Sequence, residues 1–163
     1  MSQKTTVETL QKIAFFEGFP ENHLQKLVEI SREVDYPARE TLFHEHDPAK
    51  DVHVIVSGKV SLAVCAPKFG CRQIMEVNDG ELFGWSPLLG RPRLSDTATT
   101  VKPTKAIEFD GSDLLDLCER DTDFGYHFMR RMTMVLSDRL SATRRQLFDL
   151  GGRHLPEVFA NTD

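Results

Sequence analysis

The sequence predicts an α+β fold: an antiparallel β-roll (jelly-roll-like, about eight strands) flanked by N-terminal helices and a long C-terminal helix. Three observations support this fold class. Apolar residues recur at helical spacing near the start of the chain; from Val34 to Phe109 the pattern changes to short strands separated by turn residues; and helical spacing returns near Asp123. Many short antiparallel strands in a row favour a roll, because closure removes most of the strand edges.

Two short helices are expected in the first segment, residues 1–33. Their apolar positions recur at intervals of three and four residues, namely Val7, Leu10, Ile13 and Ala14, then Leu24, Leu27 and Val28. Each helix then has one apolar face, and we expect both to pack on the roll.

Residues 34–110 form the predicted roll. Its strand segments are rich in β-branched and aromatic residues: Thr41–His44, Val52–Val56, Lys59–Val64, Arg72–Val77, Leu82–Phe83, Thr97–Val101 and Lys105–Phe109. Ser57-Gly58 and Pro67–Gly70 have the residue types of hairpin turns. The sequence therefore predicts a separate strand on each side of both turns.

Residues 111–150 are predicted to be helical. Asp110-Gly111-Ser112-Asp113 begins a helix that runs through Cys118, and the segment Asp121–Asp123 begins a longer one that reaches Leu150. Residues 151–163 follow as a tail. We expect one domain overall, and no internal repeat or linker precedes Gly151-Gly152.

The long helix carries two apolar stripes. Phe124, Phe128, Met132 and Val135 form one, which we expect to pack on the roll. The other alternates by four and three residues, the spacing of a coiled-coil seam: Met129, Thr133, Leu136, Leu140, Thr143, Leu147 and Leu150. The seam predicts a homodimer, and the alternative is a single broad stripe that faces the core.

Composition narrows the class of protein. The chain has 163 residues, 40% of them hydrophobic, and a net charge of −5, which argues against general attraction to nucleic acid or anionic membrane. No apolar run approaches the ~20 residues that span a bilayer. The N-terminus lacks the apolar core of a signal peptide, so we expect a cytoplasmic protein whose Cys65, Cys71 and Cys118 are reduced.

The most informative stretch is NDGELFGWSPLLGRPRLSDTAT, residues 78–99. Gly80 and Gly84 allow sharp backbone turns. Ser86-Pro87 has the residue types of a helix start, with serine as the cap and proline at the first helical position. A helix start beside a tight turn presents unpaired N–H groups, which can hold an anion.

This stretch resembles the phosphate-binding cassette of cyclic-nucleotide-binding domains, written roughly FGE-L-A-L-L followed by R-S-A-T. The resemblance covers about residues 10 to 150. FFEGFPENHLQKLVEI is similar to the family's opening LFxGLSxxxLxxL, and YPARETLFHEHDPAKDVHVIVSGKVSL to its YPAGExLFxEGDPAxxLYxVxSGxVxV. The resemblance implies a non-catalytic sensor domain of the catabolite-activator type, here a single-domain member with a divergent cassette (residues 80–97).

In the family, the cassette glutamate binds the ribose 2′-hydroxyl and the arginine of R-S-A-T binds the cyclic phosphate. Aligned without gaps from Phe83, these positions hold Trp85 and Leu94, and Pro87 replaces a residue that donates its N–H to the phosphate. Each lost charged hydrogen bond is worth roughly 1.5–3 kcal/mol. We therefore expect no micromolar binding of cyclic AMP or cyclic GMP in the usual pose.

Other cassette positions keep the resemblance to a ligand pocket. Ser95 and Thr97 match the family's polar residues, the N–H groups of Leu88 and Leu89 are expected to be available, and Arg93 reaches the same anion if the loop shifts by one residue. The alternative for Arg93 is a solvated loop side chain. The candidate ligand-binding residues are Phe83, Gly84, Trp85, Ser86, Leu88, Leu89, Arg93, Leu94, Ser95 and Thr97.

Two interpretations of Trp85 stay open. Its ring either fills the pocket or forms an aromatic wall for a flat ligand. The first favours a ligand-free interaction or dimerisation module. The second favours a sensor that binds a small molecule, with no certain cofactor, and signals through its last helix to a protein partner. A third possibility is a truncated transcription regulator.

Weaker patterns concern the histidines, the cysteines and the end of the chain. His44, His46 and His53 lie on adjacent predicted strands, but they lack a fixed third ligand, so we predict no metal site. Cys65 and Cys71 flank a five-residue turn and face each other across a predicted hairpin. No catalytic signature is present, so we expect no enzyme. Only GGRHLPEVFANTD follows Leu150, too short for a helix-turn-helix, so we expect no direct DNA binding.

Overall fold

The computed structural model describes residues 4–156. Residues 1–3 of the predicted N-terminal segment and residues 157–163 of the predicted tail lie outside this range. The chain divides into two compact units, and the second unit begins at Phe128, within the last helix. Within residues 4–156, no helix combines the length and the apolar character needed to cross a bilayer.

The order of elements follows the predicted pattern of helices, strands and helices. In sequence they are α1 (Val7–Gln11), the 3₁₀ helix η1 (Ala14–Phe16), α2 (Glu21–Glu29), β1 (Ser31–Tyr36), β2 (Thr41–Phe43), β3 (Asp51–Ala66), β4 (Gly70–Asn78), β5 (Leu82–Phe83), η2 (Ser86–Leu89), β6 (Thr97–Asp110), α3 (Gly111–Arg120), α4 (Thr122–Gly151) and η3 (Gly152–His154). We predicted that the N-terminal helical segment ends at residue 33 and the roll begins at residue 34, but β1 lies on both sides of this boundary.

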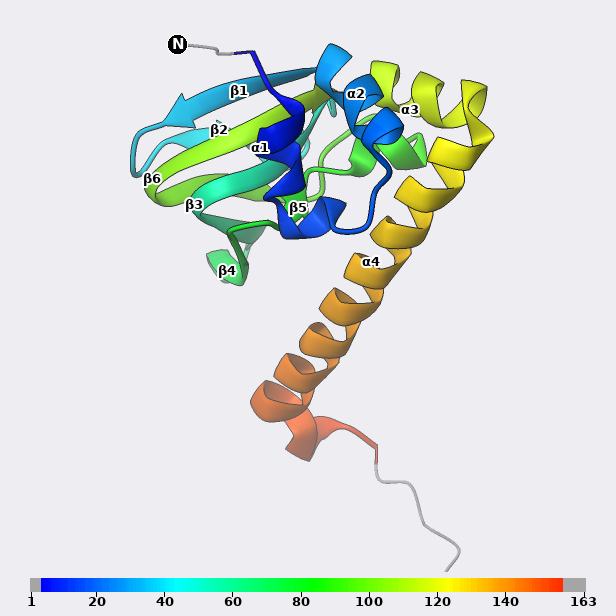
Figure 1. Ribbon diagram of the computed structural model, residues 1–163. Helices are drawn as coiled ribbons and strands as arrows, with labels where there is room; N and C mark the ends of the chain where they lie inside the picture. The colour runs from blue at the N-terminus through cyan, green and yellow to red at the C-terminus, as the bar shows by residue number, and fades with distance from the viewer. Residues whose placement is uncertain (1–3, 157–163) are drawn as a thin grey trace, which may run out of the picture. The chain divides into compact units, whose positions relative to one another are not determined.

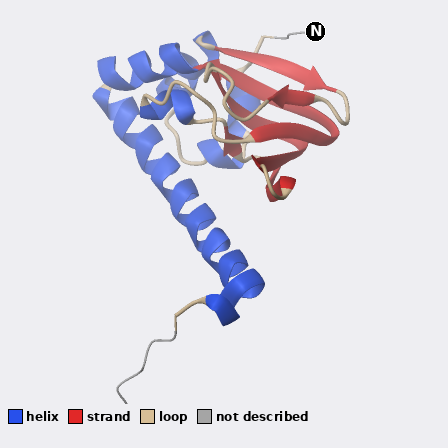
Figure 2. Ribbon diagram, turned by 180° about the vertical axis from the view of Figure 1, so that it is seen from behind, coloured by secondary structure: helices blue, strands red, loops and turns tan. Residues whose placement is uncertain are grey.

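The N-terminal helices cover one face of the sheet, as predicted (Figure 1). Thr6 caps α1, because its side chain accepts a hydrogen bond from the Thr9 N–H. Phe16 packs edge-on against Phe109 of β6, with ring centroids 6.1 Å apart. Seen from behind, the strands form one curled sheet in front of these helices (Figure 2).

Two long antiparallel strands, β3 and β6, form the centre of the roll and pair along most of their length. The last part of β6 pairs with β1 and its first part with β2. Likewise, the start of β3 pairs with β5 and its end with β4. The α+β fold class is therefore confirmed, but the sheet has six strands rather than about eight.

The difference in strand number has a physical cause at Ser57-Gly58. We predicted a hairpin turn there, but β3 continues through both residues with shifts in its register against β6. Gly58 has a φ of 136° and lies so close to β6 that an added Cβ would be 2.6 Å from the Thr104 Cα. Thus Val52–Val56 and Lys59–Val64 belong to one bent strand, and Thr97–Val101 and Lys105–Phe109 belong to another.

The second predicted turn is correct. Residues Pro67–Gly70 connect β3 to β4, and the Phe69 N–H donates to the Ala66 carbonyl at 3.1 Å. The bend in the long strands brings the apolar residues of both halves together inside the roll. This core consists of Ile55, Val60, Leu62, Val77, Phe83 and Ala98, with Leu42, Phe43 and Met75 packed against it.

The C-terminal helices begin where the sequence predicted. The Asp110 carboxylate accepts hydrogen bonds from the N–H groups of Ser112 and Asp113 at the start of α3. Where α4 begins, the Asp121 carboxylate accepts a hydrogen bond from the Phe124 N–H at 3.1 Å. Such caps satisfy N–H groups that lack partners within the helix.

The two stripes of α4 differ in exposure. Phe124, Phe128 and Met132 of the first stripe are buried. The seam is open in its second half, where Leu140 is 53%, Leu147 57% and Leu150 89% exposed.

Candidate functional site

The cassette turns depend on glycine, as predicted. Gly80 and Gly84 have φ angles of 80° and 73°, in the region that side chains disfavour. The Gly80 N–H donates to the Ile55 carbonyl at 2.7 Å. A Cβ on Gly84 would lie 3.2 Å from the His53 Nδ1, so the chain passes close to the interior of the roll at this point.

The helix start in the cassette differs from the prediction. Ser86 does not cap a helix with its side chain; the segment is a four-residue 3₁₀ helix whose cap position is Trp85. The Leu88 N–H, which we expected to be available for a ligand, donates to the Trp85 carbonyl at 2.9 Å. Proline at the start of so short a turn leaves few N–H groups free, so the predicted anion cradle is reduced.

A small cavity lies between the cassette and the roll. Its volume is about 10 Å³, close to the minimum that holds one water molecule. Phe43, Leu62, Gly84, Trp85, Ser86, Leu94, Ser95 and Asp96 line it. The structure thus brings Trp85 and Leu94 together at one cavity, although it leaves no room there for a nucleotide.

The remaining predicted residues lie elsewhere. Phe83 is fully buried in the roll core, Leu88 is buried, and Leu89 is 51% exposed. The Thr97 hydroxyl accepts a hydrogen bond from the Glu45 N–H at 2.9 Å. Arg93 is exposed and donates to the His46 carbonyl at 2.8 Å, so it closes a loop instead of replacing the cassette arginine.

A row of polar side chains inside the roll was not predicted from the sequence. Arg32 of β1 lies opposite Glu108 of β6, and Glu108 lies opposite His53 of β3. The Arg32 guanidinium is 2.6 Å from the Glu108 carboxylate, and the His53 Nε2 is 3.3 Å from it. The sequence signal was a histidine and a glutamate that each stand between two apolar residues, in Val52-His53-Val54 and Ile107-Glu108-Phe109.

This row fixes the charge of Glu108. Burial raises the pKa of the Glu108 carboxyl, but hydrogen bonds from His53 and Tyr36 and the charge of Arg32 outweigh it and lower the pKa to about 2. Burial and the hydrogen bond to Glu108 raise the pKa of Tyr36. Glu108 is therefore an anion, and Tyr36 a neutral donor, at neutral pH.

A larger cavity of about 370 Å³, here called the polar cavity, borders this row of side chains. It is lined by Tyr36, Leu42, Phe43, Asp47, Pro48, Lys50, Asp51, His53, Leu94 and Glu108. Phe43 and Leu94 separate it from the cassette cavity, because both residues line both spaces. The size is within the usual range for a small-molecule site.

The polar cavity is unsuited to an anion. Three carboxylates and one lysine line it. The Arg32 guanidinium is already paired with two of these carboxylates, at 3.1 Å from Asp51 and 2.6 Å from Glu108. His53 adds a buried Nδ1 that has no hydrogen-bond partner within residues 4–156. An unpaired buried nitrogen is costly, and this one lies beside the cassette, where an added Cβ on Gly84 would be 3.2 Å from it.

Two expectations outside the cassette require correction. Cys65 and Cys71, expected to be reduced, form a disulfide. The reason is the β3–β4 register, which places these two residues directly opposite each other, as the predicted hairpin implied. Cys118 is a buried free thiol, and burial raises its pKa to about 11.

The three histidines that we considered as possible metal ligands do not lie close together. His44 and His46 follow β2 in a turn, instead of lying on a strand as predicted, and are exposed, whereas His53 is buried in the roll. His46 has a φ of 73°, so it adopts the left-handed conformation for which the family uses glycine at this turn.

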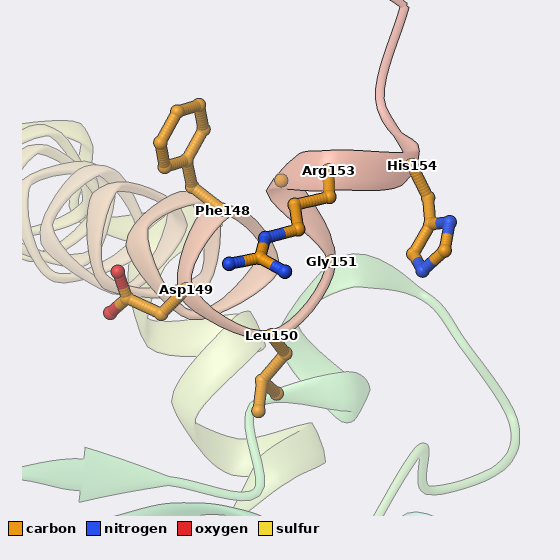
Figure 3. A pocket seen from close by; sticks show the side chains of 7 residues that line it. Phe148, Asp149, Leu150, Gly151, Arg153 and His154 are labelled. Atoms are coloured by element: carbon orange, nitrogen blue, oxygen red, sulfur yellow. The ribbon is translucent and has the colours of Figure 1, made fainter.

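A wide hollow of about 540 Å³ lies in the second unit, at the end of α4. It is lined by the consecutive residues 148–154. Figure 3 shows that Phe148, Asp149, Leu150 and His154 point in different directions from the chain. Because these side chains do not converge on a common point, the hollow lacks the arrangement of a binding site.

Comparison with known proteins agrees with this architecture. The sequence pattern of the family described as "Cyclic nucleotide-binding domain" matches residues 33–121, more than half of the chain. The "CRP-like cAMP-activated global transcriptional regulator" of Mycobacterium tuberculosis is 25% identical over 143 residues, which are 88% of this chain and 62% of that protein. The chain therefore spans less than two thirds of this relative.

Solved structures share the fold. A cyclic nucleotide-binding domain from Methylobacillus flagellatus KT superposes with a TM-score of 0.74 at 20% identity, covering 94% of this chain and 84% of the other. The c-di-GMP responsive global regulator CLP of Xanthomonas campestris has a TM-score of 0.69 at 20% identity, covering 77% of this chain and 62% of the other. From the roll, the cassette turns and the family match, the chain belongs to the cyclic nucleotide-binding domain family.

Proposed function

We propose that this chain is a non-catalytic regulatory sensor domain whose ligand enters the polar cavity instead of the cassette. The observation that carries the proposal is the difference between the two spaces, about 10 Å³ at Trp85 and about 370 Å³ beside His53. Ligand sites usually exceed 300 Å³. A cyclic nucleotide in the family's usual pose has neither the room nor the polar partners that it needs.

The polar cavity favours a neutral or cationic small molecule. Its three carboxylates repel a phosphate, whereas Lys50 can donate hydrogen bonds. Movement of Phe43 or Leu94, the two side chains that separate the spaces, would connect ligand in the polar cavity with the cassette and Trp85. The domain would then signal through its last helix to a protein partner in the cytoplasm.

Calorimetry with cyclic AMP and cyclic GMP tests the first part of the proposal. We expect dissociation constants weaker than about ten micromolar for both, because three polar anchors are absent. Trp85 is the only tryptophan, so its fluorescence reports directly on the cassette. Tight binding of either nucleotide, with a change in this fluorescence, would contradict the proposal.

Restoring the anchors provides the matched experiment. Trp85→Glu combined with Leu94→Arg should give measurable affinity for cyclic AMP, at least tenfold above the wild type, since each charged hydrogen bond is worth roughly 1.5–3 kcal/mol. Adding Pro87→Ala should increase the affinity further by restoring an N–H donor. If the triple variant folds but still does not bind cyclic AMP, the cassette alignment is wrong.

A thermal-shift screen tests the second part. The panel contains adenosine as a neutral compound, together with cyclic AMP, cyclic GMP, cyclic di-GMP, haem and aromatic acids as anions that should give no shift from the polar cavity. A ligand at 100 times its dissociation constant adds about 2.7 kcal/mol to stability. A hit in the polar cavity should lose its shift in Lys50→Ala and keep it in Leu89→Ala, whose exposed side chain lines neither space.

The second candidate is a ligand-free module that acts only by association. It is favoured by the closed cassette cavity and by the exposed leucines of α4. This candidate predicts that no compound in the panel raises the melting temperature while the chain still dimerises. Both candidate functions include the same homodimer, so the thermal-shift screen distinguishes them and the oligomeric state does not. The interface that we propose for this homodimer consists of Met129, Thr133, Leu136, Leu140, Thr143 and Leu147.

A further inference from the structure

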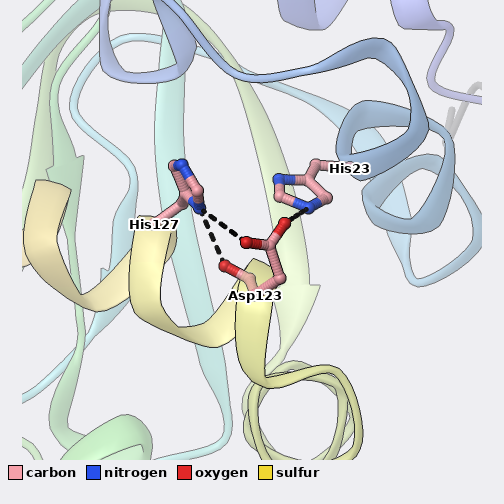
Figure 4. A group of neighbouring side chains, drawn as sticks. All are labelled: His23, Asp123 and His127. Atoms are coloured by element: carbon pink, nitrogen blue, oxygen red, sulfur yellow. Dashed lines mark hydrogen bonds and ion pairs between the residues drawn. The ribbon is translucent and has the colours of Figure 1, made fainter.

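Three side chains from two distant parts of the sequence meet at the start of α4. Within residues 4–156, His23, Asp123 and His127 form a group in which each offers one ligand atom and all three atoms lie within 4.8 Å of one another. His23 comes from α2, and the other two come from the first turns of α4. Figure 4 shows the Asp123 carboxylate directed between the two imidazole rings.

The distances within this group are close to those of a metal centre. The His23 Nε2 is 3.0 Å from one Asp123 oxygen, and the His127 Nδ1 is 3.7 Å from the other. Two ligands on a tetrahedral zinc ion, each bonded at about 2.0–2.1 Å, are roughly 3.3 Å apart. The His23–Asp123 pair therefore has this separation already, and the widest pair must close by about 1.5 Å.

The exposure of two of the side chains allows that closure. His23 is buried, with its side chain only 1% exposed, and it makes an edge-on contact with the Phe124 ring. Asp123 and His127 are 73% and 41% exposed. One imidazole is thus held by the core, while the other two ligands can move toward an ion. His127 must give up its 2.8 Å contact with the Asp123 carbonyl to do so.

The charge of the neighbouring lysine is already paired. The lysine of α2, Lys26, is paired with Asp121. Two imidazoles and one carboxylate are ligands that suit zinc and neighbouring transition metals, whereas magnesium and calcium prefer sites made of oxygen alone. The three protein ligands leave a fourth position for water, and the exposure of Asp123 and His127 gives an ion access.

We infer that His23, Asp123 and His127 form a binding site for a divalent transition metal of the zinc type. The bound ion joins α2 to the first turns of α4, residues that are about 100 positions apart in the sequence. It therefore holds the start of α4 against α2. We predicted no metal site from the sequence because only His44, His46 and His53 were considered as ligands.

Calorimetry on the full chain, purified without a histidine tag and with the disulfide intact, tests this inference. Zn²⁺ should bind with a stoichiometry of one per chain, and Mg²⁺ should not compete. Asp123→Ala and His127→Ala should each weaken Zn²⁺ binding at least tenfold. Both residues are partly exposed, so these variants are expected to fold; His23→Ala is not needed, since loss of a buried ring can unfold the chain.

His44→Ala is the matched control. His44 lies 3.6 Å from Asp47, an exposed histidine–aspartate pair with no third ligand among the described residues, and its loss should leave Zn²⁺ affinity unchanged. Cys65→Ser with Cys71→Ser should likewise bind normally. Co²⁺ should give the visible absorption of a tetrahedral site in the wild type and lose it in Asp123→Ala. The inference is overturned if wild type and Asp123→Ala take up Zn²⁺ equally, or if the control loses as much affinity as His127→Ala.

Discussion

At the scale of single residues, Glu108 is the most constrained side chain of the roll. It is 6% exposed, and it contacts Tyr36, Arg32 and His53 from two neighbouring strands. A buried carboxylate is tolerated only when it is paired and hydrogen-bonded. These contacts make Glu108 the partner that keeps the polar lining of the cavity in place.

Glu108→Gln should destabilise the protein by about 1–3 kcal/mol at neutral pH, because Arg32 loses a buried charged partner. The pKa of Glu108 is lowered to about 2 in the folded chain, against about 4.3 in an unfolded one. Its contribution is therefore complete above about pH 5 and disappears as pH falls toward 2. Urea unfolding at several pH values measures the difference between variant and wild type.

Glu76→Gln is the control for this comparison. Glu76 pairs with Lys59 at 3.0 Å, and the Glu76 side chain is 40% exposed, so its loss should matter less than that of Glu108. A difference between wild type and Glu108→Gln that stays constant from pH 7 to pH 3 would show that the charge of Glu108 is not what stabilises the fold.

At the scale of elements, the bend in β3 decides the shape of the roll. Gly58 lies at the bend, where the register against β6 shifts, and its N–H donates to the Asp79 carboxylate at 2.7 Å. Without the bend, the two halves of β3 and β6 could not enclose the core around Phe83. A single residue without a side chain thus makes the closed core of the roll possible.

Gly58→Ala should cost roughly 3 kcal/mol, since it combines an unfavourable φ with a Cβ placed against the Thr104 backbone. Gly90→Ala is the matched control, because Gly90 has a φ of 65° and an added Cβ there meets no atom within 4 Å. The control should lose only about 1–2 kcal/mol. Chemical denaturation of both variants gives the comparison, and equal losses would mean that conformation alone, and not the close approach of β6, requires glycine at position 58.

At the scale of the whole molecule, the seam of α4 is the basis of our prediction for assembly. Its central leucines alternate by three and four residues, and its second half is exposed in the single chain. An exposed apolar row of this length commonly marks an interface. A two-fold pair is the commonest closed arrangement of identical chains, so we expect the seam to join two copies.

Leu136→Asp with Leu140→Asp should convert a dimer of about twice 18.5 kDa into a folded monomer, because unpaired charges would be buried at the contact. Met134→Asp is the control: Met134 is also exposed, at 51%, but lies off the seam, so that variant should stay dimeric. Light scattering measures both masses. A wild-type mass near 18.5 kDa would reject the interface.

Local patterns in the sequence were sufficient for the fold class and the order of elements. Periods of two and of 3.6 residues separate strands from helices, and capping residues such as Asp110 and Asp121 mark where helices begin. The divergence of the cassette was also visible, since Trp85, Pro87 and Leu94 occupy neighbouring positions that align without gaps. The predicted number of strands was wrong because the residues around a glycine at a strand bend look the same in the sequence as those around a glycine in a hairpin turn.

Tertiary packing, in contrast, places distant residues in one site. The row of Arg32, Glu108 and His53 exists because three strands pair in one register, and nothing near any of these residues in the sequence specifies its partners. The same holds for His23, which reaches Asp123 across about 100 residues. Register and helix packing are set by the fit of the whole core, so local patterns specify what each segment is, and the fold specifies what the segments form together.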